Sequence, residues 1–147
     1  MEKQIKRDYY LGQLINRRGN GLIKIVTGIR RCGKSFLLRT LFKNYLLENG
    51  VDKEHVIEMA FDLFDNMEYR DPKVFYPWVK EQMKDEGKYY FLLDEVQMLD
   101  EFVSVLNGLA DRKNCDVYVT GSNARFLSRD IATEFGGRGD EIHMYPL

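Results

Sequence analysis

The chain has 147 residues, of which 44% are apolar and 13% aromatic, and its net charge at pH 7 is -1. This composition excludes a disordered chain and a uniformly basic nucleic-acid binder, and the length suits one domain, residues 1–147. No apolar run reaches membrane-spanning length, and the first residues lack the apolar stretch of a signal peptide. We therefore expect a cytoplasmic protein with no membrane association.

The charge is distributed unevenly along the chain. Residues 1–43 carry 11 Lys and Arg against 2 Asp and Glu, whereas the remaining residues carry 11 against 21. Such asymmetry indicates a phosphate-facing half, a partner surface, or two parts of one domain that pair with each other. We favour the last interpretation.

From residue 22 onward, apolar β-rich runs alternate with helical stretches, which is typical of a parallel sheet covered by helices on both faces. Residues 1–21 are predicted to form a lead-in helix and a connection. The predicted strands are residues 22–28, 55–62, 89–95, 116–123 and 141–147. The predicted helices run from the glycine loop to Gly50, from Pro77 to Glu86, from about Asp100 to Arg112, and over 124–135. Residues 63–72 and 136–140 are predicted loops, and Pro77 is placed at a helix start because proline breaks helix interiors.

Residues 28–35 match the phosphate-binding pattern G-x-x-x-x-G-K-[ST], the Walker A motif, between a predicted strand and a predicted helix. Glycines let the backbone curl so that successive N–H groups point inward, and the helix start adds a positive dipole end. We expect Lys34 to reach the β- and γ-phosphates of ATP and the Ser35 hydroxyl to bind Mg²⁺. The predicted nucleotide-binding loop comprises Gly28, Ile29, Arg30, Arg31, Cys32, Gly33, Lys34, Ser35 and Phe36.

Two further predicted strands end in polar residues. Asp94 follows a buried apolar strand and is predicted to hold Mg²⁺, while Glu95 is predicted to orient or deprotonate an attacking water. Ser122 and Asn123 end the next strand, and one of them is expected to reach the γ-phosphate or the water. Plain turn chemistry is the equal alternative for both, and it is the preferred interpretation for Thr120.

The motifs GIRRCGKS, FLLDE with the following Val96-Gln97, and VTGSN occur in an order and spacing that resemble a known family. The chain is similar, from Arg7 to Leu147, to P-loop ATPases of the additional-strand class, specifically the AAA-like AAA_14 group, which often precedes a nuclease-like domain. The resemblance implies an α/β fold, the three-layer P-loop NTPase fold, with a five-stranded parallel sheet of order 5-1-4-3-2.

The resemblance also implies roles for particular residues. Lys34, Ser35, Asp94 and Glu95 match the phosphate-binding, magnesium and catalytic positions, and Ser122-Asn123 matches the sensor. Gln97 matches a polar position that relays the state of the γ-phosphate.

Arg138, in GGRGD, is similar to the family's GR arginine. A guanidinium at the transferred phosphate stabilises developing charge. Whether Arg138 acts on its own nucleotide or on a neighbour's is open, and a plain solvent-exposed loop arginine is the alternative.

Other residues capable of chemistry give weaker signals. Cys32 and Cys115 are too few for a disulfide framework and are read as free thiols. His55 and His143 have no companions at metal-ligand spacing and are read as surface residues. Tyr69, Phe75, Tyr76 and Trp78 are read as core. Tyr9, Tyr10 and Leu11 are candidates to flank an adenine ring.

The sequence therefore predicts an ATPase domain that binds ATP and Mg²⁺ and hydrolyses ATP to ADP and phosphate. We expect it to be coupled to a C-terminal domain or a partner protein outside these residues. A nucleotide-operated switch or scaffold with little turnover is one alternative, and a small-molecule phosphotransferase with Asp62 or Asp65 as its base is another. A homo-oligomer and a nucleic-acid partner stay open.

Overall fold

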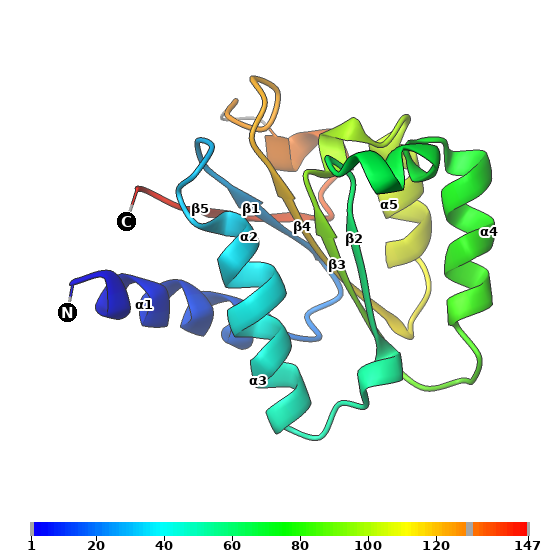
Figure 1. Ribbon diagram of the computed structural model, residues 1–147, viewed down its shortest axis with the longest axis horizontal. Helices are drawn as coiled ribbons and strands as arrows, with labels where there is room; N and C mark the ends of the chain where they lie inside the picture. The colour runs from blue at the N-terminus through cyan, green and yellow to red at the C-terminus, as the bar shows by residue number, and fades with distance from the viewer. Residues whose placement is uncertain (1, 129–130, 147) are drawn as a thin grey trace.

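The computed structural model of the chain describes residues 2–128 and 131–146 (Figure 1). Its elements are, in chain order, α1 (Glu2–Asn16), β1 (Ile23–Thr27), α2 (Lys34–Phe36), η1 (Leu37–Phe42), α3 (Lys43–Glu48), η2 (Lys53–His55), β2 (Val56–Ala60), η3 (Phe64–Arg70), α4 (Pro72–Gln82), β3 (Tyr89–Asp94), η4 (Val96–Met98), α5 (Phe102–Ala110), β4 (Cys115–Gly121), η5 (Ile131–Phe135) and β5 (Gly139–His143). Segments α2, η1 and α3 follow one another without a break, so they form one helix whose middle part, η1, is a π-helix.

The five strands form one parallel sheet in the order β2-β3-β4-β1-β5. This confirms the predicted order, which is the same series counted from the other edge. Every residue of β1, β3 and β4 is buried, because helices cover both faces of the sheet centre. The parallel arrangement brings the carboxyl ends of all five strands to one edge of the sheet.

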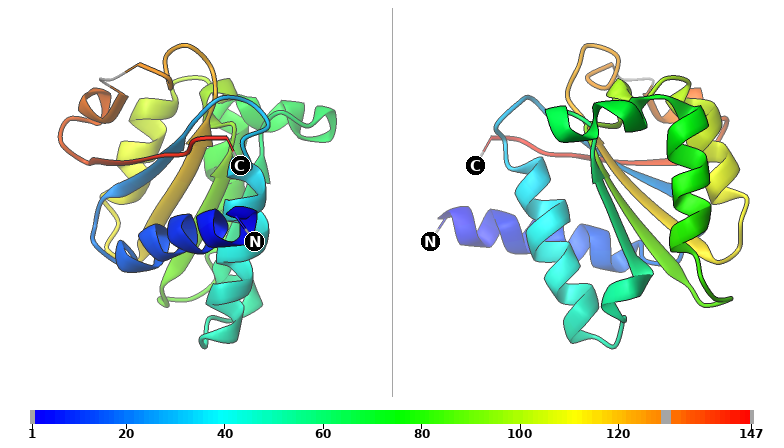
Figure 2. Two further views of the ribbon diagram at one scale, coloured as in Figure 1. Left: turned by 90° about the vertical axis from the view of Figure 1, so that its left-hand side faces the viewer. Right: turned by 45° about the vertical axis from the view of Figure 1, so that its right-hand side comes forward.

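Helices cover both faces of the sheet, as Figures 1 and 2 show, and one apolar core lies on each face. Helix α1 and the helix formed by α2, η1 and α3 cover one face, where Leu14 and Phe42 pack with Tyr118. Helices α4 and α5 cover the other face, where Phe75 and Leu106 belong to the larger core. Among the described residues, no helix is both long and apolar enough to cross a membrane.

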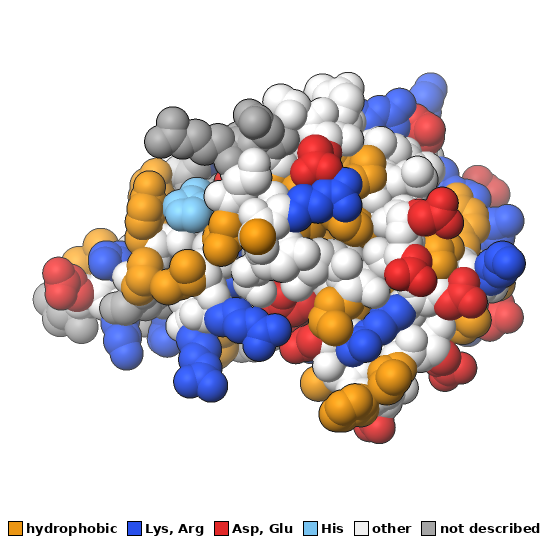
Figure 3. Space-filling model, turned by 90° about the horizontal axis from the view of Figure 1, so that it is seen from above, with side chains coloured by type: hydrophobic (Ala, Val, Ile, Leu, Met, Phe, Trp, Pro, Cys, Tyr) orange, Lys and Arg blue, Asp and Glu red, His pale blue; other side chains and the backbone are white. Residues whose placement is uncertain are grey.

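The basic and acidic parts of the chain pair with each other in the folded domain, as expected. Seen from above, the carboxyl edge shows a group of basic side chains at the lower left, and acidic ones interspersed with basic ones on the right (Figure 3). The ion pairs that join the first 43 residues to the rest are Lys24–Asp116 at 2.6 Å, Arg17–Asp140 at 3.1 Å, Arg39–Glu58 at 3.3 Å and Lys43–Glu58 at 2.6 Å.

The predicted start of the helix at Pro77 is wrong. Helix α4 begins at Pro72, where the fixed φ of proline suits the first turn, and the Asp71 carboxylate accepts a hydrogen bond from the Lys73 N–H at 2.9 Å. Pro77 sits inside this helix, so packing of Phe75 and Val79 against the core outweighs one missing backbone hydrogen bond.

The helix α4 also ends earlier than predicted, at Gln82 instead of Glu86. The Tyr89 hydroxyl accepts hydrogen bonds from the Lys84 and Asp85 N–H groups at 2.9 and 3.1 Å, and these bonds hold the backbone in a turn. Residues 63–72, predicted to be a loop, contain the 3-10 helix η3.

The predicted helix over residues 124–135 is also wrong in its described parts, while residues 129 and 130 lie outside the described residues. Residues 124–127 form turns, and the 3-10 helix η5 follows. The Asn123 side chain accepts a hydrogen bond from the Phe126 N–H at 3.1 Å, which favours a turn. The Phe126 ring is fully buried and occupies the space that a side chain at Gly121 would need, so the turn packs directly onto the end of β4.

At the amino edge of the sheet, Lys24 and Asp116 form an ion pair with side chains 0% and 2% exposed. The Asp116 carboxylate also accepts hydrogen bonds from the Gly19 N–H at 2.9 Å and from the Tyr118 hydroxyl at 2.6 Å. Burial lowers the pKa of Lys24, and the Asp116 carboxylate opposes that shift. Each charge therefore depends on the other for its compensation.

We predict that Asp116→Ala lowers the free energy of unfolding by about 3–5 kcal/mol, because it leaves Lys24 buried without a counter-charge. Urea denaturation followed by circular dichroism measures the change. The matched control is Glu134→Ala, which removes the partner of the half-exposed Arg125 and should cost no more than about 1 kcal/mol. Equal effects of the two substitutions would contradict the structural role of the buried pair.

Candidate functional site

The glycine loop follows β1 directly and leads into α2. Gly28 has a φ of 147°, and a Cβ at this position would lie 2.6 Å from the Met144 carbonyl oxygen. Gly33 has a φ of 99°, and its carbonyl accepts the Leu37 N–H at 2.9 Å as the first helical bond. Both glycines are therefore required by the backbone path.

Lys34 lies inside the curve of this loop. Its ammonium group donates hydrogen bonds to the Gly28 and Ile29 carbonyl oxygens, each at 2.9 Å, and lies 3.8 Å from the Cys32 sulfur. The Lys34 residue is only 4% exposed. The loop thus holds a positive charge beside its own backbone, where an anion such as a phosphate group can replace the carbonyl partners.

The outer part of the loop faces solvent. Ile29, Arg30, Arg31 and Phe36 are exposed, and Arg31 has a φ of 66°, a left-handed conformation that is costly for a residue with a side chain. The Arg7 guanidinium lies 4.8 Å from the centre of the Phe36 ring. Lead-in helix α1 therefore contacts the end of α2, close to the phosphate loop.

Asp94 is placed beside this loop by the carboxyl end of β3. The residue is 4% exposed and accepts a hydrogen bond from the Thr120 hydroxyl at 2.5 Å. Burial raises the pKa of the Asp94 carboxyl, and the charges of Glu95 and Asp62 raise it further, whereas hydrogen bonds from Thr120 and Ser35 lower it. The Ser35 contact joins the phosphate loop to the acidic strand end across the sheet edge.

Glu95 follows in a left-handed conformation, with a φ of 52°. Its N–H donates to the Thr120 hydroxyl at 2.9 Å. One carboxylate oxygen, Oε1, accepts hydrogen bonds from the Ser122 hydroxyl at 2.7 Å and from the Gln97 amide at 2.8 Å. One oxygen of the Glu95 carboxylate is therefore already bonded by two neighbours, and the sequence connected both of them with the γ-phosphate.

The donor set at this edge fits Mg²⁺ by its chemistry. Mg²⁺ prefers oxygen ligands and is usually bound by one or two carboxylates together with water and substrate phosphates. Ser35 and Asp94 supply a hydroxyl and a carboxylate that already contact each other. The described residues contain no group of three His, Cys, Asp or Glu arranged around a metal position.

Arg138 lies away from these residues. The Ile23 N–H donates to the Arg138 carbonyl oxygen at 2.7 Å, so Arg138 stands beside the start of β1, whereas the phosphate loop follows its end. Its guanidinium forms an ion pair with Asp111 and donates to the Asn107 carbonyl at 3.1 Å. The structure thus brings Arg138 to the amino edge of the sheet.

Asn123 is at the correct edge, but its side chain is directed to its own turn, where it bonds the Phe126 N–H and not the carboxylates of Asp94 and Glu95. Thr120, for which the sequence favoured plain turn chemistry, instead contacts both acidic residues. Thr120 lies at the end of the strand next to FLLDE, and this position indicates a contact with the acidic residues. The sequence alone does not reveal it, because it does not say that the two strands are neighbours.

The chain matches the family model AAA_14, described as an AAA domain, over residues 20–147. A protein of Haemophilus influenzae, named only as uncharacterized, is 38% identical over 144 residues, covering 97% of this chain and 36% of the relative. The uncharacterized protein MJ1544 of Methanocaldococcus jannaschii is 26% identical over 149 residues, covering 99% and 30%. This chain thus spans about a third of the length of these relatives.

Solved structures share the fold at low identity. A Drosophila ORC structure bound to DNA gives a TM-score of 0.61 at 13% identity, covering 94% of this chain and 89% of that chain. AMPPCP-bound DnaA from Aquifex aeolicus gives 0.57 at 18%, covering 92% and 44%. PCH-2 of C. elegans gives 0.58 at 14%, covering 98% and 40%. These likenesses confirm the predicted P-loop NTPase fold.

We predict that Asp94→Asn stabilises the domain in the absence of nucleotide and metal, by about 0.5–2 kcal/mol at pH 7.5. The folded-state pKa of Asp94 is raised, so its charged form destabilises the fold above that pKa. This cost disappears as the pH falls toward about 3.9, the ordinary carboxyl value, because both states then bind the proton.

Thermal denaturation with a chelator at pH 7.5 and pH 4.5 measures the difference between wild type and Asp94→Asn. Asp65→Asn, a change at an exposed position, serves as the control and should shift stability by less than about 0.5 kcal/mol. A destabilising Asp94→Asn, or a gain that is equal at both pH values, would refute this account of the buried carboxyl.

Proposed function

We propose that this chain, which belongs to the AAA_14 family of AAA domains, binds Mg-ATP at the carboxyl edge of its sheet and hydrolyses it to ADP and phosphate. AMPPCP, an ATP analogue, is the ligand named for the DnaA structure that shares this fold, which supports a nucleoside triphosphate as ligand. We also propose that the chain acts together with a C-terminal domain or a partner protein, and that it does so in the cytoplasm.

The observation that carries this proposal is the contact between Ser35 and Asp94. One residue begins the helix after the phosphate loop and the other ends β3, and Thr120 of the strand between them bonds the carboxylate. A cation-binding pair next to a buried lysine and a curled backbone is the arrangement that a magnesium-bound triphosphate requires.

In the proposed complex, the Lys34 ammonium exchanges its two carbonyl partners for β- and γ-phosphate oxygens, and loop N–H groups from Gly28 to Phe36 bind the remaining phosphate oxygens. Ser35 and Asp94 would hold Mg²⁺, which supplies positive charge at the β- and γ-oxygens when it is bound. Tyr9 lies exposed at the outer face of α1 and is the proposed contact for the base.

Glu95 is the proposed residue that orients the attacking water and accepts its proton. Ser122 and Gln97 both bond Oε1, so Oε2 is the oxygen proposed to bond the water, and either donor can turn to the γ-phosphate when it is bound. Asn123 can join them only by leaving its turn. Glu95 is therefore bonded to two groups that the γ-phosphate can also bond.

Arg138 cannot reach a nucleotide in the loop of its own chain, because the length of β1 separates them. Its proposed catalytic role is therefore at the nucleotide of a second copy of the chain, which makes a homo-oligomer part of this proposal. A guanidinium supplied by a neighbour stabilises charge on the transferred phosphate in other P-loop enzymes.

A nucleotide-operated switch with little turnover is the second candidate, and one observation favours it. The Glu95 carboxylate is held by Ser122 and Gln97 at 2.7 and 2.8 Å. If ATP does not release it, bound nucleotide changes the conformation without being cleaved. Tight ATP binding with no phosphate release in the wild type would identify this function.

We predict that Lys34→Ala weakens Mg-ATP binding about 10- to 100-fold, since it removes a charged hydrogen-bond donor from the phosphates. Isothermal titration calorimetry with the non-hydrolysable analogue AMPPCP measures the change. Lys73→Ala, at an exposed position of α4, is the matched control and should leave the affinity unchanged. Unaltered binding by Lys34→Ala would show that the loop does not hold the phosphates.

We predict that Glu95→Gln keeps the affinity for Mg-ATP within about threefold but lowers kcat about 10²- to 10⁴-fold. The substitution preserves shape and an oxygen that Ser122 can bond, and removes only the basic group. Phosphate release under saturating ATP measures kcat. Turnover at the wild-type rate would exclude Glu95 as the base.

A further inference from the structure

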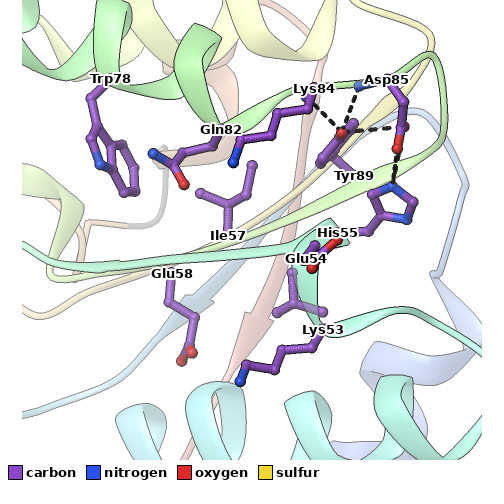
Figure 4. A pocket seen from close by; sticks show the side chains of 11 residues that line it. Lys53, Glu54, His55, Ile57, Glu58, Trp78, Gln82, Lys84, Asp85 and Tyr89 are labelled. Carbon is purple, nitrogen blue, oxygen red and sulfur yellow. Dashed lines mark hydrogen bonds and ion pairs between the residues drawn. The ribbon is translucent and has the colours of Figure 1, made fainter.

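A cavity of about 310 Å³ opens beside β2 (Figure 4), and its lining contains no residue of the phosphate loop. Its lining includes Val56, Ile57 and Glu58, three consecutive residues of this strand. Side chains of a strand alternate between the two faces of the sheet, so consecutive residues line one cavity only where it runs along the edge of the strand. The cavity is therefore a groove at the open edge of the sheet.

The backbone of β2 has unused hydrogen-bonding groups at this edge. β2 is the last strand of the sheet and pairs only with β3 among the described residues. The Phe61 N–H donates to the Asp94 carbonyl at 3.1 Å, so residues 57, 59 and 61 face β3, and residues 56, 58 and 60 face outward.

Some of the outward groups have partners within the chain. The Val56 N–H bonds the Lys53 carbonyl, and the Ala60 carbonyl accepts from the Asn66 amide at 2.9 Å. The Glu58 N–H and carbonyl and the Val56 carbonyl have no hydrogen-bond partner among the residues that the structure describes, whereas Ala60 is buried and does not line the groove. Their spacing matches the backbone of another extended chain.

The two sides of the groove differ in chemistry. Figure 4 shows Ile57 on the side of Trp78 and Gln82, and Glu58 on the side of Lys53. Trp78 is half-buried, so part of its surface is available to an apolar side chain.

The side that holds Glu58 is positively charged. Glu58 is paired with both Arg39 and Lys43, at 3.3 and 2.6 Å, and the exposed Lys53 adds a third cation. Glu54, which also lines the groove next to Lys53, adds a second carboxylate, so three cations face two carboxylates and one net positive charge remains. An acidic side chain is therefore the complement on this side.

We propose that this groove binds an extended peptide segment of a partner protein, with alternating apolar and acidic residues, which adds to the sheet as a sixth strand beside β2. The outward backbone groups of β2 bond its main chain, its apolar side chains contact Trp78 and Ile57, and its acidic side chains face Lys53. Because the sheet edge lies inside a groove, a single extended strand can reach it more easily than the edge strand of a second folded domain can. This function is independent of ATP hydrolysis.

The chain's single tryptophan is Trp78, so tryptophan fluorescence reports directly on this groove. The probe is the blocked peptide acetyl-Val-Asp-Val-Asp-Val-Asp-amide. We expect a saturable blue shift of the Trp78 emission, because bound peptide excludes water from the indole. A peptide with Lys in place of each Asp should bind at least about fivefold more weakly, which corresponds to one lost charge pair.

Two variants at one position test the main-chain bonds. Glu58→Pro removes the outward N–H without removing a hydrogen bond to β3, and proline is tolerated at such edge positions. Glu58→Ala removes the same carboxylate and keeps the N–H. We expect Glu58→Pro to bind the peptide at least about tenfold more weakly and Glu58→Ala to bind within about threefold of wild type.

A test on the peptide does not depend on the folding of any variant. One peptide carries N-methyl groups on every Val amide and another on every Asp amide. In a strand, alternate N–H groups point to the same side, so only one of the two methylated peptides should lose binding.

The proposal is overturned by an unchanged Trp78 emission up to about 1 mM peptide, a range that covers weak peptide binding. Equal binding of the Asp and Lys peptides, equal loss in Glu58→Pro and Glu58→Ala, or equal binding of both methylated peptides would also overturn it. Sedimentation that shows a peptide-free dimer, dissociated by Glu58→Pro, would assign the edge to a second copy of the chain instead. None of these results bears on phosphate release, so they leave the proposed ATPase function untouched.

Discussion

The hydroxyl of Thr120 is the contact on which the arrangement of the site depends. It donates to the Asp94 carboxylate at 2.5 Å and accepts from the Glu95 N–H at 2.9 Å, so one small side chain fixes two consecutive acidic residues. This requires β4 to lie beside β3 in the observed register, in which Leu93 is opposite Val119, the residues just before Asp94 and Thr120. A slip of one residue would turn Thr120 to the other face and separate it from both partners.

The charged side chains of the site are partly or fully buried, which lowers the stability of the fold, and the two apolar cores offset this cost. Lys34 is bonded by its own loop carbonyls, and Glu95 by Ser122 and Gln97, so each functional group already has a substitute partner. Asp94 is the exception, since its raised pKa shows that its charge is not fully compensated. A carboxylate in this state attracts a cation, and preorganised donors need little rearrangement when the phosphates arrive.

The phosphate loop and the buried strands could be predicted because their signals are local: a motif of fixed spacing between apolar runs. The strand order came from the family resemblance, since periodicity does not say which parallel strands are neighbours. Pro77 misled the prediction because tertiary packing of Phe75 and Val79 outweighs local helix propensity. Residues 124–127 and Thr120 depend on contacts with Gly121 and Asp94, which form only after the strands assemble.

One helix joins the phosphate loop to the open edge of the sheet. The helix formed by α2, η1 and α3 begins with Lys34 and Ser35, and farther along it Arg39 and Lys43 bond Glu58 on β2. Between Ser35 and Lys43 lies the π-helical part, a rare geometry that is frequent at functional sites. A ligand that moves Glu58 and a nucleotide that moves Ser35 therefore act on the same helix, and any energetic coupling between them must be equal in both directions.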